Sequence, residues 1–251
     1  YYRISTMSLS GKVAIITGSS QGIGKATALR LASEGASVII NYRSSAKAAN
    51  DLVEQIGSDR ALAVQADVSK LPDLDHLVQE TVTRFGKIDI LILNAGILPM
   101  RDLESTTEED FDSTYNLMVK GPYFLAQKAA KHMSPGARII FVSSSVTANS
   151  AIAPTYLLYA SAKGAIEQLA RVAAKDLGRK GILVNTIAPG PTTTELFLEG
   201  KSEQLIKTLA GTNPFNRIGE PEEIAAVMAF LSGKESSWMS GQVLRVNGAM
   251  A

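Results

Sequence analysis

The 251-residue sequence is long enough for one large α/β domain or two small ones, and its formal net charge of +1 gives no indication of a nucleic-acid partner. It has no cysteine, which excludes disulfides and thiolate catalysis, and its two histidines form no metal-ligand pair, so we expect no bound metal. No apolar run approaches the ~20 residues of a membrane span, and residues 1–6 do not form a signal peptide, so we expect a cytoplasmic protein without a membrane partner.

Strand and helix patterns alternate along the chain. An apolar run at 12–17 predicts a buried strand, a glycine-rich turn follows, and a helix at 25–34 leads to a second strand at 37–41. Further helices are expected at 46–56, 71–85, 107–133, 157–177 and 221–231, and further strands at 61–66, 88–93, 138–142, 182–187 and 242–246. The helix at 107–133 should bend near Gly121 and Pro122.

This alternation predicts an α/β fold with one doubly wound, Rossmann-type parallel sheet of about seven strands and helices on both faces. We assign residues 10–251 to this single domain and residues 1–9 to an N-terminal tail. The widest irregular stretch, 189–216, includes an amphipathic segment at 195–209. Connections this long are usually functional or mobile, so we expect a substrate lid, with a surface loop as the alternative.

The glycine-rich turn between the first strand and helix suits a phosphate, because backbone N–H groups and a helix N-terminus meet there. Gly18 would allow the tight turn, Gly22 the approach of the ligand, and Gly24 close helix packing. The spacing is one residue longer than the Gly-x-Gly-x-x-Gly pattern of dinucleotide-binding proteins. The remaining expected contacts in this turn are Ser20, Gln21 and Ile23.

The end of the second strand indicates which dinucleotide is bound. An acidic residue there selects NAD, but the sequence reads Asn41-Tyr42-Arg43-Ser44. Arg43 could pair with a 2′-phosphate and Ser44 could add a hydroxyl, so we expect NADP(H), with Tyr42 beside it. The alternative is that Arg43 points into solvent.

Tyr159 and Lys163 are four residues apart and therefore share one face of a predicted helix. A nearby ammonium can lower a tyrosine pKa from its usual value of about 10, which would make Tyr159 an acid–base group near neutral pH. Taken alone, the pair could also be a surface tyrosine beside a solvated lysine.

Together these motifs resemble those of the short-chain dehydrogenases/reductases, over residues 10–248. They are Thr17-Gly18-x-x-x-Gly22-Ile23-Gly24, Asp67-Val68, Asn94-Ala95-Gly96, a serine cluster, Tyr159-x-x-x-Lys163 and Asn185-x-Ile187-x-Pro189-Gly190. The chain is most similar to 3-oxoacyl-carrier-protein reductase-like and fungal carbonyl or naphthol reductase-like members. The resemblance implies transfer of a hydride between NADPH and a ketone, or the reverse reaction on an alcohol.

The resemblance also implies residue roles. Tyr159 would donate the proton in reduction, and Lys163 would hold the nicotinamide ribose and lower the Tyr159 pKa. A serine would bind the substrate oxygen: counting along the strand favours Ser144, and counting back from Tyr159 favours Ser145. Asp67 would contact the adenine and Asn94 would tie the fourth strand to its neighbours. The other cofactor contacts would come from Val68, Ala95, Gly96, Ile187, Pro189, Gly190, Thr192 and Thr194.

One position departs from the family pattern. Members usually carry an asparagine three residues before Gly121, where it supports a proton relay, but this chain has Met118. A thioether accepts hydrogen bonds only weakly, and Asn116 lies about 200° around the helix, so the relay would be impaired. An alternative function is therefore an NADPH-binding regulator with impaired turnover. A third possibility keeps the fold but makes the chain a sugar epimerase or dehydratase.

The expected substrate pocket is apolar, which favours an apolar or aromatic ketone. Its expected lining is Ile97, Leu98, Pro99, Met100, Leu157, Phe197 and Leu198. Family members commonly form homotetramers through two long helices and the last strand. Alanine faces would allow such helices to approach each other, or would pack inside the chain; they are Ala126, Ala129, Ala130, Ala170, Ala173 and Ala174.

Overall fold

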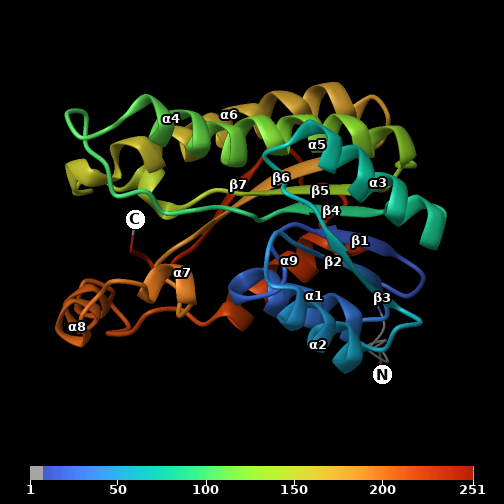
Figure 1. The fold of residues 1–251 in the computed structure, drawn as a ribbon, viewed down its shortest axis with the longest axis horizontal. Helices are drawn as coiled ribbons and strands as arrows, with labels where there is room; N and C mark the ends of the chain where they lie inside the picture. Colours follow the sequence, from blue (N-terminus) through green and yellow to red (C-terminus); the bar gives the residue numbers. More distant parts are fainter. Residues whose placement is uncertain (1–7, 251) are drawn as a thin grey trace.

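A single sheet of seven parallel strands runs through the computed structural model, which describes residues 8–250 (Figure 1). The strand order is β3-β2-β1-β4-β5-β6-β7. The strands are β1 (Val13–Ile16), β2 (Ser37–Tyr42), β3 (Ala61–Gln65), β4 (Ile90–Leu93), β5 (Arg138–Val142), β6 (Leu183–Pro189) and β7 (Val243–Val246). The predicted doubly wound α/β fold is therefore confirmed.

Helices cover both faces of this sheet (Figure 1). One layer consists of α1 (Gly22–Ser33), α2 (Ala46–Ile56) and α9 (Pro221–Ser232). The other consists of α3 (Leu71–Phe85), α4 (Glu108–Tyr115), α5 (Gly121–Ala129) and α6 (Leu157–Gly178). Two short helices, α7 (Glu195–Leu198) and α8 (Glu203–Gly211), follow β6 and lie apart from both layers.

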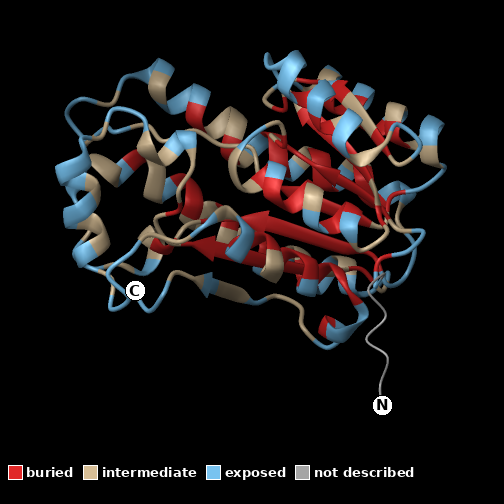
Figure 2. Cartoon of the chain, turned by 90° about the horizontal axis from the view of Figure 1, so that it is seen from below, coloured by how far each residue is buried: buried red, intermediate tan, exposed pale blue. Residues whose placement is uncertain are grey.

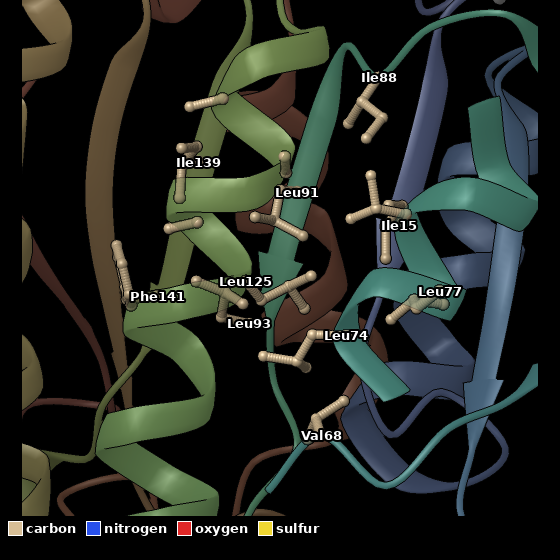
Figure 3. Packing of buried hydrophobic residues seen from close by; sticks show 14 of the residues in the cluster. Ile15, Val68, Leu74, Leu77, Ile88, Leu91, Leu93, Leu125, Ile139 and Phe141 are labelled. Carbon is tan, nitrogen blue, oxygen red and sulfur yellow. The ribbon is translucent and has the colours of Figure 1, made fainter. Parts of the chain in front are cut away.

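Both faces of the strands are apolar, because each face packs against helices. On the first face, Ile15, Leu91 and Ile139 of the sheet pack against Leu74 of α3 and Leu125 of α5 (Figure 3). A second cluster lies between the sheet and α1, α2 and α9. Buried residues accordingly follow the strands, whereas exposed residues lie on the outer helix surfaces and loops (Figure 2). Within residues 8–250, none of the helices is long and apolar enough to cross a membrane.

The folded domain begins before residue 10, which is its predicted start. Leu9, assigned above to the tail, is only 1% exposed, and its N–H donates to the Glu34 carbonyl at 2.9 Å. Ser8 also donates a hydrogen bond to the Glu34 carboxylate. A single apolar residue ahead of a strand gives no periodic signal, which explains the error. The rest of the predicted tail, 1–7, lies outside the described residues.

The predicted helix at 107–133 is divided by a π-helix, η1 (Asn116–Lys120). The irregularity thus precedes the predicted bend at Gly121 and Pro122. Pro122 lies in the first turn of α5, and its missing N–H fits a turn where the hydrogen-bond pattern changes. A Cβ at Gly121 would clash with the Val68 carbonyl, so this glycine lets the helix pass close to the loop after β3.

The alanine faces pack inside the chain. Five of the six alanines are buried in the core cluster around α3, α5 and α6, and Ala173 packs against that cluster. Their small side chains let α5 and α6 lie close to the sheet. Core packing, the second of the two interpretations above, therefore describes them.

Candidate active site

A cavity of about 590 Å³ lies at the carboxyl ends of the strands. Its walls include segments that follow β1 to β6, and in an open parallel sheet this is where ligands bind. All but two of the predicted cofactor contacts, Gly24 and Ile187, line it. Those that line it are Gly18, Ser20, Gln21, Gly22, Ile23, Tyr42, Arg43, Ser44, Asp67, Val68, Asn94, Ala95, Gly96, Tyr159, Lys163, Pro189, Gly190, Thr192 and Thr194.

The glycine-rich turn has the backbone that its sequence predicts. Gly18 and Gly22 have φ values of 61° and 54°, in the left-handed region that favours glycine. Since α1 begins at Gly22, its first N–H groups, which lack helical partners, are at the cavity wall. Gly24 is one of the two exceptions. A Cβ there would lie 2.5 Å from the Gly18 carbonyl and 2.7 Å from Asn94 Nδ2, so Gly24 permits close packing of α1 but does not line the cavity.

Two polar residues at the strand ends have different structural roles. Asn94 Nδ2 donates to the carbonyls of Thr17 (2.9 Å) and Gly18 (3.2 Å), which ties β4 to the turn after β1. Asp67 accepts a hydrogen bond from Ser69 Oγ at 2.7 Å. Burial pushes the pKa of Asp67 up, but this bond and nearby positive charges outweigh burial and hold the pKa below its usual value.

The end of β2 presents a cation to the cavity. Arg43 lines the cavity, and no carboxylate of residues 8–250 lies within ion-pairing distance of its guanidinium. Asn41 is buried instead, where Oδ1 accepts from the Gly18 N–H at 3.1 Å and Nδ2 donates to the Ala66 carbonyl at 3.0 Å. This end of the cavity therefore suits a phosphate attached near the adenosine ribose.

The three consecutive serines after β5 point in different directions. Ser143 Oγ donates to Glu167 Oε1 at 2.8 Å, and Ser145 Oγ donates to the Ala188 carbonyl at 3.0 Å. Of the three serines, only Ser144 interacts with the Tyr159 hydroxyl closely enough to lower its pKa. The geometry thus favours Ser144 over Ser145 as the hydroxyl that faces the substrate.

Tyr159 and Lys163 lie on one face of α6, with Lys163 Nζ 5.7 Å from the centre of the Tyr159 ring. Lys163 Nζ donates to the Val142 carbonyl at 2.7 Å. Burial raises the pKa of Tyr159 to about 12, although the interaction with Ser144 lowers it, and burial lowers the pKa of Lys163 to about 8. The net shift of the Tyr159 pKa is therefore upward, opposite to the expected lowering, because burial dominates.

Comparisons with known proteins agree with this geometry. A family model described as enoyl-(acyl carrier protein) reductase matches residues 18–250. A hydroxynaphthalene reductase-like protein of Metarhizium robertsii is 41% identical, with 96% of this chain and 95% of that protein covered. The chain belongs to the short-chain dehydrogenases/reductases. One solved member, from Burkholderia cenocepacia in complex with NADP, has a TM-score of 0.91 and 34% identity over 97% of this chain and 99% of that one.

A second similar structure is that of a named ketoreductase. It is the angucycline C-6 ketoreductase LanV with bound NADP, which has a TM-score of 0.90 and 36% identity. The match covers 97% of this chain and 96% of that one. The family predicted from the sequence is therefore confirmed.

Met118, at the position of the family's usual asparagine, lies behind the cavity wall. The residue is 1% exposed. A Cβ added to Gly96 would lie 3.4 Å from Met118 Sδ and 3.7 Å from Lys163 Nζ, so the thioether and the ammonium approach the same glycine. Asn116 does not line the cavity. Met118 therefore brings a thioether, not an amide, to the glycine that Lys163 also approaches.

The substrate end of the cavity differs in part from the prediction. Ile97, Leu98 and Phe197 line it as expected. Ile187, which was expected as a cofactor contact, does not line the cavity, because it is fully buried in the core. The other expected residues that do not line the cavity are Pro99, Met100, Leu157 and Leu198.

Several lining residues were missed, among them Tyr156, Ile152, Leu196, Leu209 and Met250. Tyr156 could have been found, because it precedes Tyr159 by three residues; the two rings meet edge to face with centroids 6.4 Å apart. Met250 follows the last strand and belongs to no periodic segment. Within residues 8–250 there is no cluster of three or more potential metal ligands.

Proposed function

We propose that this chain is an NADPH-dependent carbonyl reductase that acts reversibly on a ketone and its alcohol. The observation that carries this proposal is one continuous cavity, which contains both the glycine-rich turn and the Ser144–Tyr159–Lys163 set. NADP-bound relatives with TM-scores of 0.91 and 0.90 support the cofactor. The regulator alternative is not favoured, since the curated relatives are named as reductases and the Ser–Tyr–Lys set is complete.

Each of the three residues has a distinct task in this reaction. NADPH, when bound, supplies a hydride to the carbonyl carbon. The Tyr159 hydroxyl gives its proton to the carbonyl oxygen, and Ser144, which contacts Tyr159, donates a hydrogen bond to the same oxygen. Lys163 binds the cofactor ribose hydroxyls, and its positive charge stabilises the phenolate that Tyr159 becomes.

The function is tested by following NADPH consumption with a panel of ketones. We expect turnover with at least one aromatic ketone such as 1-tetralone, and formation of the alcohol in equal amount. Tight NADPH binding without conversion of any ketone, diketone or quinone in the panel would contradict the proposal.

The substrate that best fits the cavity is an aromatic or otherwise apolar ketone. Tyr156, Ile97, Leu98 and Phe197 supply an apolar and aromatic wall beside Tyr159. The relatives' names point the same way, since they include a hydroxynaphthalene reductase-like protein and an angucycline ketoreductase. The segment at 189–216 contributes Phe197 and Leu209 to this wall, which supports its proposed role as a substrate lid.

Selectivity for NADPH over NADH should depend on Arg43. Arg43→Ala should raise the KM for NADPH about 10- to 100-fold and leave the KM for NADH nearly unchanged, because one charge-assisted contact to the 2′-phosphate is lost. Steady-state kinetics with both cofactors measure this. The control, Arg171→Ala, removes an exposed arginine from α6. Equal changes in the KM values for NADPH and NADH would show that Arg43 does not bind the 2′-phosphate.

Met118 should limit proton delivery to Lys163. Met118→Asn places an amide next to Lys163 that can bind a water, so we expect kcat to rise about three- to tenfold. The partly satisfied buried amide should also cost about 1–3 kcal/mol of unfolding free energy. Met118→Leu, the control, should change stability by less than about 1.5 kcal/mol and leave kcat unchanged. Equal kcat values for all three proteins would mean that the proton takes another route.

The chain's proposed assembly is a homotetramer. Trp238 is fully exposed in the segment that leads to β7, the strand at one edge of the sheet, and Phe230 of α9 is 40% exposed. Exposed apolar groups and an open sheet edge favour contact with a second copy. Light scattering on the purified protein measures the mass, and a monomer would contradict this assembly. The cytoplasmic location stays a prediction from the sequence.

A further inference from the structure

The carboxylate of Glu167 contacts the segment that carries Ser144. Glu167 is on α6, one turn after Lys163, and therefore shares a helix face with it. Its Oε1 accepts hydrogen bonds from Ser143 Oγ at 2.8 Å and from Thr147 Oγ1 at 2.6 Å. These two donors precede and follow Ser144 in the chain, so one carboxylate oxygen binds the segment 143–147 at two points.

Each of these two hydroxyls also lies near a backbone carbonyl, which is a weaker acceptor than the Glu167 carboxylate. Ser143 Oγ lies 3.3 Å from the Lys163 carbonyl, and Thr147 Oγ1 lies 2.9 Å from the Ser144 carbonyl. Each hydroxyl has a single proton, and a bond to a carboxylate is shorter and stronger than a bond to a neutral carbonyl. No lysine, arginine or histidine within residues 8–250 forms an ion pair with Glu167, so this carboxylate is not part of a surface salt bridge.

The opposite side of the segment has its own anchor. Ser145 Oγ donates to the Ala188 carbonyl of β6 at 3.0 Å and is buried. Ser144 therefore lies between one attachment to β6 and one to α6. Because α6 also carries Tyr159, the attachment through Glu167 connects the two sides of the Ser144–Tyr159 contact directly.

We propose that Glu167 is a positioning residue that sets the distance between the Ser144 and Tyr159 hydroxyls. This role rests on the proposed function, because it affects turnover only if those two hydroxyls act on the substrate. Glu167 itself does not line the cavity and would touch neither substrate nor cofactor.

The test compares kcat/KM for the best ketone in Glu167→Ala and Glu167→Gln, each made in the original chain and in a Ser144→Ala background. Glu167→Ala should lower kcat/KM about 10- to 100-fold, since small misplacements of reacting groups have effects of this size. Glu167→Gln keeps an oxygen acceptor and should stay within about threefold of the original. In the Ser144→Ala background, adding Glu167→Ala should lower kcat/KM by less than about twofold, because the hydroxyl that Glu167 positions is already absent.

The control is Gln168→Ala, at an exposed position on the same helix, and should leave kcat/KM unchanged. Equal losses from Glu167→Ala in both backgrounds, or a loss in Glu167→Gln as large as in Glu167→Ala, would overturn the positioning role. If Glu167→Ala does not fold, Thr147→Val can be used instead, because it removes one of the two hydrogen bonds to Glu167. It should lower kcat/KM about threefold in the original chain and leave it unchanged in the Ser144→Ala background. An original protein that reduces no ketone refutes the proposed function itself, which is a different result from an active protein that is insensitive to Glu167.

Discussion

Tyr159→Phe should lower kcat for ketone reduction about 10²- to 10⁴-fold and leave the Kd for NADPH within about threefold of the original value. The substitution removes the proton donor but keeps the ring and its edge-to-face contact with Tyr156. Because burial raises the pKa of Tyr159 to about 12, the original phenol carries the proton that it would donate throughout the neutral range. Single-turnover kinetics with bound NADPH measure the loss directly.

The matched control for this variant is Tyr156→Phe, which removes the neighbouring phenol oxygen from the same cavity. We expect Tyr156→Phe to change kcat far less than Tyr159→Phe, since Tyr156 has no part in proton transfer. If Tyr159→Phe kept kcat within threefold of the original, the proton would have to come from another group and the mechanism above would be wrong.

Lys163→Met should lower kcat/KM about 10²- to 10³-fold and at the same time stabilise the protein. The activity falls because the charge that stabilises the Tyr159 phenolate and the contact with the cofactor ribose are lost. The stability rises because Lys163 is a buried ammonium whose only described hydrogen bond is to the Val142 carbonyl. Burial lowers the pKa of Lys163 to about 8, and a shift of this size from the usual 10.5 corresponds to about 3 kcal/mol.

Part of that gain is offset by the carbonyl that loses its donor, so we expect the unfolding free energy to rise by about 1–2 kcal/mol at pH 7. For a chain of this length, each kcal/mol should raise Tm by about 2–4 °C. Between pH 8 and 10.5 the unfolded chain binds the Lys163 proton and the folded chain does not, so the original protein gains stability as pH rises through this window. The stability of the Lys163→Met protein should not rise in this pH window. A variant that is both less stable and fully active would contradict the role given to Lys163.

The fold could be predicted from the sequence because its signals are local. Each strand is a short apolar run, as in Val13–Ile16 and Ile90–Leu93, and each helix has its own periodicity and ends. This part of the cavity lining was predictable for the same reason, since its glycines and polar residues lie directly after predicted strands. Gly18, Asn94 and Arg43 illustrate this, because their position at strand ends alone places them at one edge of the sheet.

Other features depend on contacts between segments that are distant in the sequence, so no local sequence pattern predicts them. The direction of each serine at 143–145 is decided by partners on α6 and β6, namely Glu167, Tyr159 and the Ala188 carbonyl. The pKa of Tyr159 depends on how deeply its hydroxyl is enclosed, which spacing along a helix does not reveal. Met250 reaches the cavity only because the chain after β7 returns to it.

The most direct test of the account is hydride transfer itself. The protein is incubated with NADPH that carries deuterium at both C4 positions and with the best ketone of the panel, and the alcohol is analysed by mass spectrometry. The account predicts one deuterium per product molecule, on the carbinol carbon, and almost no label transfer with Tyr159→Phe. An alcohol without deuterium, or no alcohol although NADPH is bound, would contradict the claim that this cavity reduces ketones with NADPH.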